Sequence, residues 1–264
     1  MNHQKQHAVL PKSSHDQMAR QSFLTLMREQ IMGPLRNANK DVYRDRLQPA
    51  FQRGHGRAPS SRKEVQDLLN DDPYYQTWSA VHRTIQEILW DEVGETIETQ
   101  LPELVEQANA AGETYGSIRL NPKIAIPKYI SSVDIHVMPG NFQTELMPED
   151  VYAGALYDRG VFIYSMGRRG PLGQGMGEET VGFIKDTFPQ IAPTRILEVG
   201  CSVGHALLAF VDGFPEADVY GIDIGAPMIR YAHARAESLG KAVHLSQQNA
   251  CQTDFADDSF DLVV

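Results

Sequence analysis

The chain has 264 residues, of which 42% are hydrophobic, and a formal net charge of −10 at pH 7. This length suggests about two domains, and the acidic balance argues against nucleic acid or an anionic membrane as a partner, because phosphate binding depends on clustered Lys and Arg. Two cysteines are too few for a disulfide framework or a cysteine-rich metal site. The N-terminus is polar and no run of about 20 apolar residues could span a membrane, so we expect a soluble cytoplasmic protein.

Residues 1–115 carry apolar side chains at helical spacing, which predicts an all-helical region of four or five helices. Asp16 is expected to cap the first helix. The sequence at 61–64, Ser-Arg-Lys-Glu, fits a capping box, and Pro73 suits the first turn of a longer amphipathic helix. Asp91, Glu92, Glu95 and Glu98 follow at helical spacing and are expected to form a solvated acidic face rather than a cation site.

Residues 116–175 are expected to form an irregular linker or lid. Val133, Ile135 and Val137 alternate with polar residues, which predicts a short strand. From residue 140 to 175, seven glycines indicate an irregular stretch that contains several aromatic residues.

The pattern changes again in residues 176–264. A first helix is expected from residue 178, and short apolar strands at 196–199, 219–224 and 243–245 then alternate with helices at 204–211 and 227–239. A fourth strand is expected to begin at residue 260. This alternation predicts a doubly wound α/β fold with a parallel sheet, in which ligands bind at the carboxyl ends of the strands.

A tight turn joins the first of these strands to its helix, in the sequence Glu198-Val-Gly200-Cys-Ser202-Val-Gly204-His205. Gly200 and Gly204 allow the backbone to turn sharply and to approach a ligand closely. A dinucleotide-binding turn requires glycine where Ser202 and His205 stand, and no Lys of a phosphate-binding loop follows. The turn therefore favours a ligand without phosphates and disfavours a nicotinamide dehydrogenase.

Polar side chains follow the next two strands. Asp223 ends the second strand, where a carboxylate can accept hydrogen bonds from both hydroxyls of a ribose. Asn249 follows the third strand at a position that an adenine edge would reach, and the small side chain of Ala250 leaves room for a flat ring.

These three motifs resemble the class I S-adenosylmethionine-dependent methyltransferases, most closely the group with the type 11 and ubiquinone/menaquinone-type enzymes. The resemblance covers residues 176–264, about a third of the chain. It implies that Asp223 binds the ribose and that Ser202 replaces a usual glycine, while Asn249 replaces a commoner Asp. The residues that it assigns to the cofactor are Glu198, Gly200, Cys201, Ser202, Gly204, Asp223, Ile224, Met228, Asn249 and Ala250.

The function that the resemblance implies is methyl transfer from S-adenosylmethionine to a small-molecule acceptor. The alternative is a non-catalytic S-adenosylmethionine-binding protein with a regulatory or assembly role. No catalytic residue can be assigned, and the helical region is a candidate contact for a homo-oligomer. Cys201 is expected to be a small buried residue rather than a nucleophile, and His205, His233 and His244 are expected at the surface or on helix faces.

Aromatic residues before the first strand have two interpretations. Tyr152, Tyr157, Tyr164 and His136 are candidates for a lid that lines the acceptor pocket and faces the sulfonium, or they are core residues. Members of the resembled family have a seven-stranded sheet, whereas this sequence stops within the expected fourth strand. We therefore expect an N-terminal fragment, truncated in that strand.

Overall fold

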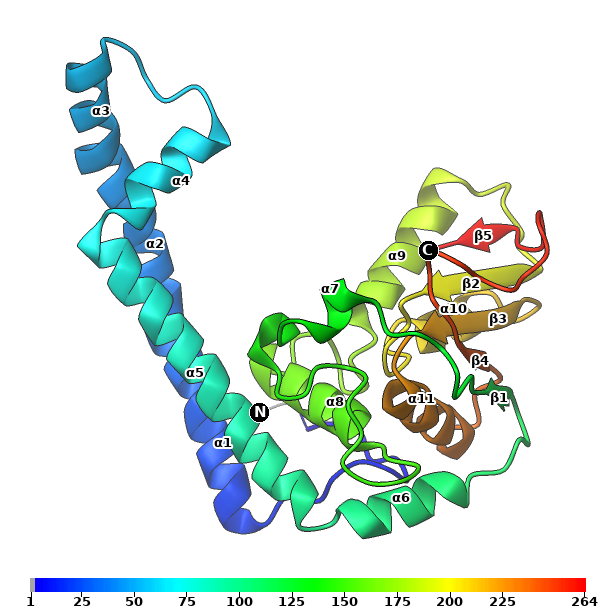
Figure 1. Cartoon of the computed structure of the whole chain (residues 1–264). Coiled ribbons are helices and arrows are strands. Elements are labelled where there is room, and N and C mark those ends of the chain that lie inside the picture. Colours follow the sequence, from blue (N-terminus) through cyan, green and yellow to red (C-terminus); the bar gives the residue numbers. More distant parts are fainter. Residues whose placement is uncertain (1–2) are drawn as a thin grey trace.

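The computed structural model describes residues 3–264, except for the side chain of Met32. Figure 1 shows a long helical arm that extends from a body built around a parallel sheet. No helix in the described part of the chain is both long and apolar enough to cross a bilayer. The helices of the arm and of the segment that leads to the body are α1 (His15–Met27), η1 (Arg28–Met32), α2 (Gly33–Val42), η2 (Tyr43–Leu47), α3 (Gln48–His55), α4 (Arg62–Asn70), α5 (Pro73–Glu98) and α6 (Leu101–Asn109).

The all-helical prediction for the N-terminal region is confirmed, but its caps differ in detail. Ser14, not Asp16, caps α1: the Ser14 Oγ accepts from the Gln17 N–H, and the Gln17 side chain accepts from the Ser14 N–H. The hydroxyl of Ser61 caps α4 as predicted, at 3.2 Å from the Glu64 nitrogen. The Glu64 carboxylate does not complete the predicted box, because it accepts from the Ser60 N–H and from Arg57.

The acidic run on α5 is only partly solvated. Glu92 is 9% exposed, and its carboxylate accepts a hydrogen bond at 2.6 Å from Nε of Arg20 on α1. The prediction of a solvated face is therefore wrong for this residue, since the spacing alone could not show that α1 would cover it. Across residues 3–264 no group of three or more side chains could hold a metal ion.

The segment from 116 to 175 is more ordered than the sequence indicated. It contains β1 (Ser117–Arg119), α7 (Lys128–Ser131), η3 (Ile135–Val137) and α8 (Tyr152–Tyr164). The strand predicted at Val133, Ile135 and Val137 is wrong: a 3-10 turn stands there, and Val133 is 62% exposed. Side-chain donors of Gln86 and Trp90 hold this turn by its His136 carbonyl, at 2.7 and 3.0 Å.

The prediction of irregular structure was also wrong for α8, and two glycines explain the error. A Cβ on Gly154 would lie 2.3 Å from Cβ of Tyr231, and one on Gly160 would lie 2.2 Å from the ring of Trp90. Glycine is needed at both positions because α8 packs closely against α11 and α5. The two glycines therefore mark helix contacts rather than turns.

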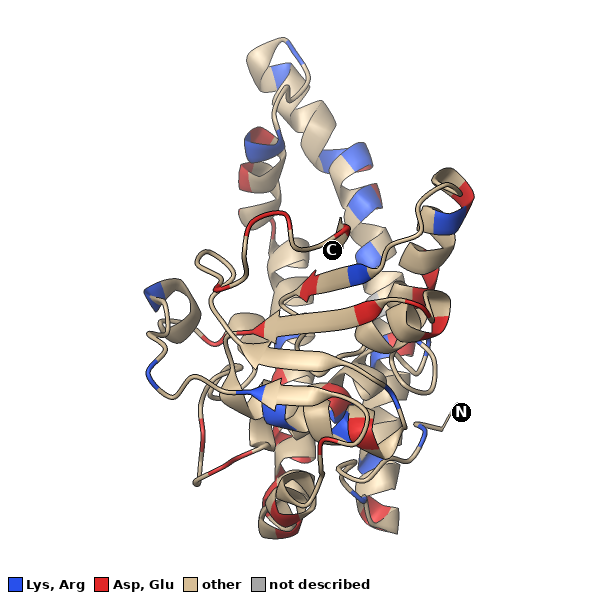
Figure 2. Ribbon diagram, turned by 90° about the vertical axis from the view of Figure 1, so that its right-hand side faces the viewer, with Lys and Arg blue, Asp and Glu red and all other residues tan. Residues whose placement is uncertain are grey.

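All five strands of the sheet are parallel, in the order β1-β4-β3-β2-β5, with α8 and α11 packed together beside it (Figures 1 and 2). The α/β fold class is confirmed, and β1 adds an edge strand that the sequence did not reveal. The elements of this part are α9 (Gly175–Thr187), β2 (Arg195–Val199), α10 (Leu207–Gly213), β3 (Asp218–Asp223), α11 (Ala226–Ser238), β4 (His244–Gln247) and β5 (Leu262–Val263).

Candidate functional site

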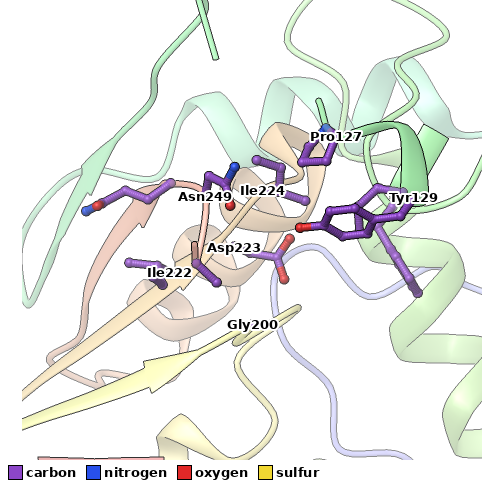
Figure 3. A pocket seen from close by; sticks show the side chains of 11 residues that line it. Pro127, Tyr129, Gly200, Ile222, Asp223, Ile224 and Asn249 are labelled. Carbon is purple, nitrogen blue, oxygen red and sulfur yellow. The ribbon is translucent and has the colours of Figure 1, made fainter. Parts of the chain in front are cut away.

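The carboxyl ends of β2, β3 and β4 surround one cavity of about 260 Å³ (Figure 3). Gly200 follows β2, Asp223 ends β3, and Asn249 and Ala250 follow β4, so the topology brings together the three motifs of the sequence. Residues from the segment before α8 form the opposite wall: Pro127, Tyr129, Ile130 and Phe142.

The turn after β2 has the backbone conformation that its glycines allow. Gly200 has a φ of 74°, and a Cβ at this position would have nothing within 4 Å. Open space beside a glycine at the cavity wall is the feature that a closely bound ligand requires. Ser202 adopts a φ of 54°, a left-handed conformation that disfavours side chains other than glycine. Its backbone N–H donates to Oδ2 of Asp223 at 3.0 Å, which holds the strained turn in place.

Asp223 is the central acceptor of the site. Besides the bond from Ser202, its Oδ1 accepts from the Gly225 N–H at 2.9 Å. An ionised carboxylate has about four acceptor positions. Backbone bonds from Ser202, Gly225 and Ile224 leave capacity for a further donor such as a ribose hydroxyl. Burial raises the pKa of Asp223, and the hydrogen bonds from Gly225 and Ser202 oppose this rise.

A second carboxylate lies behind the turn. Burial, and then the negative charge of Asp223, raise the pKa of Glu198 to about 8. Its Oε2 atom is buried and has no hydrogen-bond partner within residues 3–264. A ligand that carries positive charge would favour the ionised forms of both buried carboxyl groups.

The ten residues assigned to a cofactor fall into two groups. Five of them line the cavity: Gly200, Asp223, Ile224, Asn249 and Ala250. The other five, Glu198, Cys201, Ser202, Gly204 and Met228, are not among the residues that line it. Met228 is fully buried in the core that includes α8 and α11, and burial raises the pKa of the Cys201 thiol well above its usual value, as suits a buried structural residue.

Sequence reasoning missed the wall built by Pro127, Tyr129, Ile130 and Phe142, and also Gln248. The four wall residues lie in a segment that carries no motif, and folding alone brings them to the strand ends. Gln248 directly precedes Asn249, so its place after a strand was the one signal available.

The aromatic candidates separate in the structure. Tyr157 lies next to the turn, because its ring stacks on His205 with centroids 6.0 Å apart and meets Phe142 edge to face at 5.8 Å. Tyr152 instead packs in the core, where its hydroxyl donates to Glu98 at 3.4 Å. Tyr157 is therefore a tyrosine of the expected lid that contacts the turn after β2.

The three histidines were expected at the surface or on helix faces. His233 lies on α11 but is buried, and His205 is half-buried in the turn after β2. Nε2 of His205 lies 2.7 Å from Oδ1 of Asp158, with 14% of the histidine side chain exposed. His233 is 4% exposed and bonds through Nε2 to the Gly112 carbonyl at 3.0 Å. Both contacts join segments far apart in the sequence, which spacing could not reveal.

The model of the Methyltransferase domain family matches residues 196–264. Demethylmenaquinone methyltransferase of Thermus thermophilus is 35% identical over 72 residues, which are 27% of this chain and 33% of that protein. The matched region thus spans about a third of the length of that relative.

Two solved structures are similar to parts of the chain. The plantazolicin methyltransferase BpumL, in complex with a monoazolic desmethylPZN analogue and SAH, is 23% identical with a TM-score of 0.29, covering 33% of this chain and 32% of its own. A provisionally assigned O-methyltransferase from Nostoc punctiforme is 14% identical with a TM-score of 0.35. The similarity covers 96% of this chain and 70% of that protein. At these scores neither structure informs the site.

The matched segment contains the turn after β2, the acidic end of β3 and the Asn-Ala pair after β4, and all three meet at one cavity. Its open glycine wall and its spare carboxylate acceptors suit the adenosine part of S-adenosylmethionine. Residues 196–264 are therefore similar to the Methyltransferase domain family, and their motifs meet at this one cavity.

Proposed function

We propose that the protein binds S-adenosylmethionine in the cavity at the ends of β2, β3 and β4 and transfers the methyl group to a small-molecule acceptor. The observation that carries this proposal is that Gly200, Asp223 and Asn249, separated in sequence, line the same cavity. Asp223 would accept the ribose hydroxyls, Ile224 and Ala250 would pack against the adenine, and Asn249 would hydrogen-bond its edge.

The cofactor supplies an activated methyl group on a sulfonium, so the acceptor gains a bond to carbon while the sulfur keeps the electron pair of the broken bond. The task of the chain is therefore to align the acceptor, the methyl carbon and the sulfur. Such positioning is worth about 7–11 kcal/mol of barrier in well-oriented systems. The positive charge of the sulfonium would favour the ionised forms of Glu198 and Asp223, whose pKa values are raised by burial. The Tyr157 ring lies beside the turn, where it would face that charge.

Binding of S-adenosylhomocysteine, measured by calorimetry, tests the cofactor assignment. Asp223→Ala removes the proposed ribose acceptor and should weaken binding at least about tenfold, because charged hydrogen bonds contribute about 1.5–3 kcal/mol. Asp218→Ala is the matched control, since Asp218 is an exposed residue at the opposite end of the same strand. Equal affinity of both variants for S-adenosylhomocysteine would contradict the proposal.

The second candidate function is S-adenosylmethionine binding without catalysis, with the helical arm as a contact surface for a partner. The observation that favours it is the projection of α2, α3 and α4 away from the sheet (Figure 1). Transfer of a labelled methyl group from S-adenosylmethionine to a pool of small metabolites separates the two functions. Tight cofactor binding with no transfer to any metabolite would favour the second.

A further inference from the structure

A second cavity, of about 160 Å³, lies between α5, α8 and the η3 turn. Its aromatic walls are formed by Trp90, Tyr157 and Tyr164, its aliphatic wall includes Val161, and Arg169 contributes the charge. Three of its lining residues, His136, Tyr157 and Tyr164, are among the aromatic candidates for the lid of an acceptor pocket, whereas the contributions of Trp90 and Arg169 were not expected from the sequence.

The size and the walls of the cavity limit what can occupy it. An apolar cavity of about 150 Å³ is known to accommodate one benzene molecule, so this one has room for a single six-membered ring. Aromatic rings pack favourably against other rings, stacked or edge to face. Trp90 and Tyr164 present such surfaces, and the indole N–H of Trp90 is already bonded to the His136 carbonyl at 3.0 Å.

Arg169 differs from the two arginines nearby. Arg168 forms an ion pair with Glu29 at 3.0 Å, and the guanidinium of Arg28 lies 3.7 Å above the ring of Tyr164. Arg169 is half-buried, and within residues 3–264 its guanidinium has neither an ion pair nor a hydrogen bond. A free guanidinium on the wall of a cavity matches the planar, two-oxygen geometry of a carboxylate.

The second cavity is adjacent to the cofactor site. Tyr157 lines it, and the Tyr157 ring contacts Phe142, which lines the cavity at the strand ends. Burial raises the pKa of the Tyr157 hydroxyl, and the positive charge of Arg169 opposes this rise. Arg169 is thus close enough to influence Tyr157, and a ring in this cavity would lie next to the cavity at the strand ends.

We propose that this cavity binds the methyl acceptor, that the acceptor carries a single aromatic ring with a carboxylate, and that Arg169 binds the carboxylate. The inference rests on the proposed methyltransferase function and names its substrate class. The amino-acid part of S-adenosylmethionine also carries a carboxylate, so the experiment must distinguish these two sources.

Calorimetry with benzoate, in the presence of saturating S-adenosylhomocysteine, tests the inference. The protein should bind benzoate at least tenfold more tightly than benzamide, which has the same shape without the charge. Arg169→Gln should remove this preference, whereas Arg168→Gln, the adjacent and already paired arginine, should keep it. Val161→Phe fills the cavity and should abolish binding of both probes while S-adenosylhomocysteine still binds.

A second measurement identifies the source of the carboxylate. S-adenosylhomocysteine carries the carboxylate, and 5′-methylthioadenosine lacks the amino-acid part altogether. If Arg169→Gln weakens binding of S-adenosylhomocysteine but not of 5′-methylthioadenosine, Arg169 binds the cofactor and the inference is overturned. Equal affinity of the unaltered protein for benzoate and benzamide, or no binding of either, overturns it as well.

The two proposals fail in different ways. Absence of S-adenosylhomocysteine binding contradicts the methyltransferase proposal, and benzoate titrated alone then still shows whether Arg169 and the cavity bind an aromatic acid. Normal S-adenosylhomocysteine binding together with no preference for benzoate contradicts only the assignment of the acceptor.

Discussion

Asp158 on α8 and His205 in the turn after β2 are joined by a contact of 2.7 Å between Oδ1 and Nε2, with the carboxylate 1% exposed. The same carboxylate accepts from the Tyr231 hydroxyl at 2.8 Å and lies 3.0 Å from Nε2 of His7. Asp158 thus connects the N-terminal segment, α8, α11 and the turn of the cofactor site. Burial alone would raise the pKa of Asp158. The charge of Arg235 and the hydrogen bonds of His205 and His7 nevertheless hold this pKa well below its usual value.

Replacing Asp158 with Asn should destabilise the protein by about 3–5 kcal/mol, because it leaves the buried guanidinium of Arg235 without its charged partner. Asp186→Asn, an exposed residue on α9, is the control and should change stability by less than about 0.5 kcal/mol. Urea unfolding at pH 7 measures both. Because the folded pKa of Asp158 is depressed, its contribution is present above the unfolded pKa, about 3.9, and is lost as the pH falls below it. The difference in unfolding free energy between the two variants should therefore become smaller in acid.

Glu198 should make the stability of the ligand-free protein depend on pH in the opposite sense. Its folded pKa of about 8 lies above the unfolded value, so the folded state holds a proton that the unfolded state has released, and stability falls as the pH rises from about 4.3 to 8. The free energy of unfolding of Glu198→Gln, measured with urea at both pH values, should equal that of the unaltered protein near pH 4.5 and exceed it at pH 8. The exposed Glu216→Gln serves as control, and a pH-independent difference for Glu198→Gln would contradict the burial of this carboxyl.

Ser202 tests whether the turn needs only its backbone donor. Ser202→Gly keeps the N–H that bonds to Asp223 and removes the Cβ at a φ of 54°, so stability should change by no more than about 1 kcal/mol. Ser202→Val places a β-branched side chain in the left-handed region and should cost about 1–3 kcal/mol. S-adenosylhomocysteine affinity of the Gly variant should stay within about threefold of the original. A larger loss would assign the hydroxyl a direct contact.

Gly160 and Gly182 are both helical glycines, but their surroundings differ. A Cβ on Gly160 would lie 2.2 Å from the ring of Trp90, whereas one on Gly182 would have nothing within 4 Å. Gly160→Ala should therefore destabilise by about 1–3 kcal/mol, and Gly182→Ala should stabilise by about 0.5–1 kcal/mol because alanine favours the helix. Thermal unfolding measures the direction of the stability change in both variants. A Gly160→Ala variant as stable as the unaltered protein would show that α5 and α8 are not packed this closely.

The sequence by itself determined the parts of the protein that depend on local pattern. The spacing of apolar residues and the positions of turn residues predicted β2, β3, β4 and their helices. The topology of a parallel sheet then required Gly200, Asp223 and Asn249 to meet at one edge. Only the tertiary structure decided that Tyr152–Tyr164 is a helix, since its glycines are explained by contacts with Trp90 and Tyr231. It also decided that Arg169 faces a cavity and that Asp158 joins four segments. Such features depend on contacts between residues far apart in the chain, and local propensity carries no information about which partners will meet.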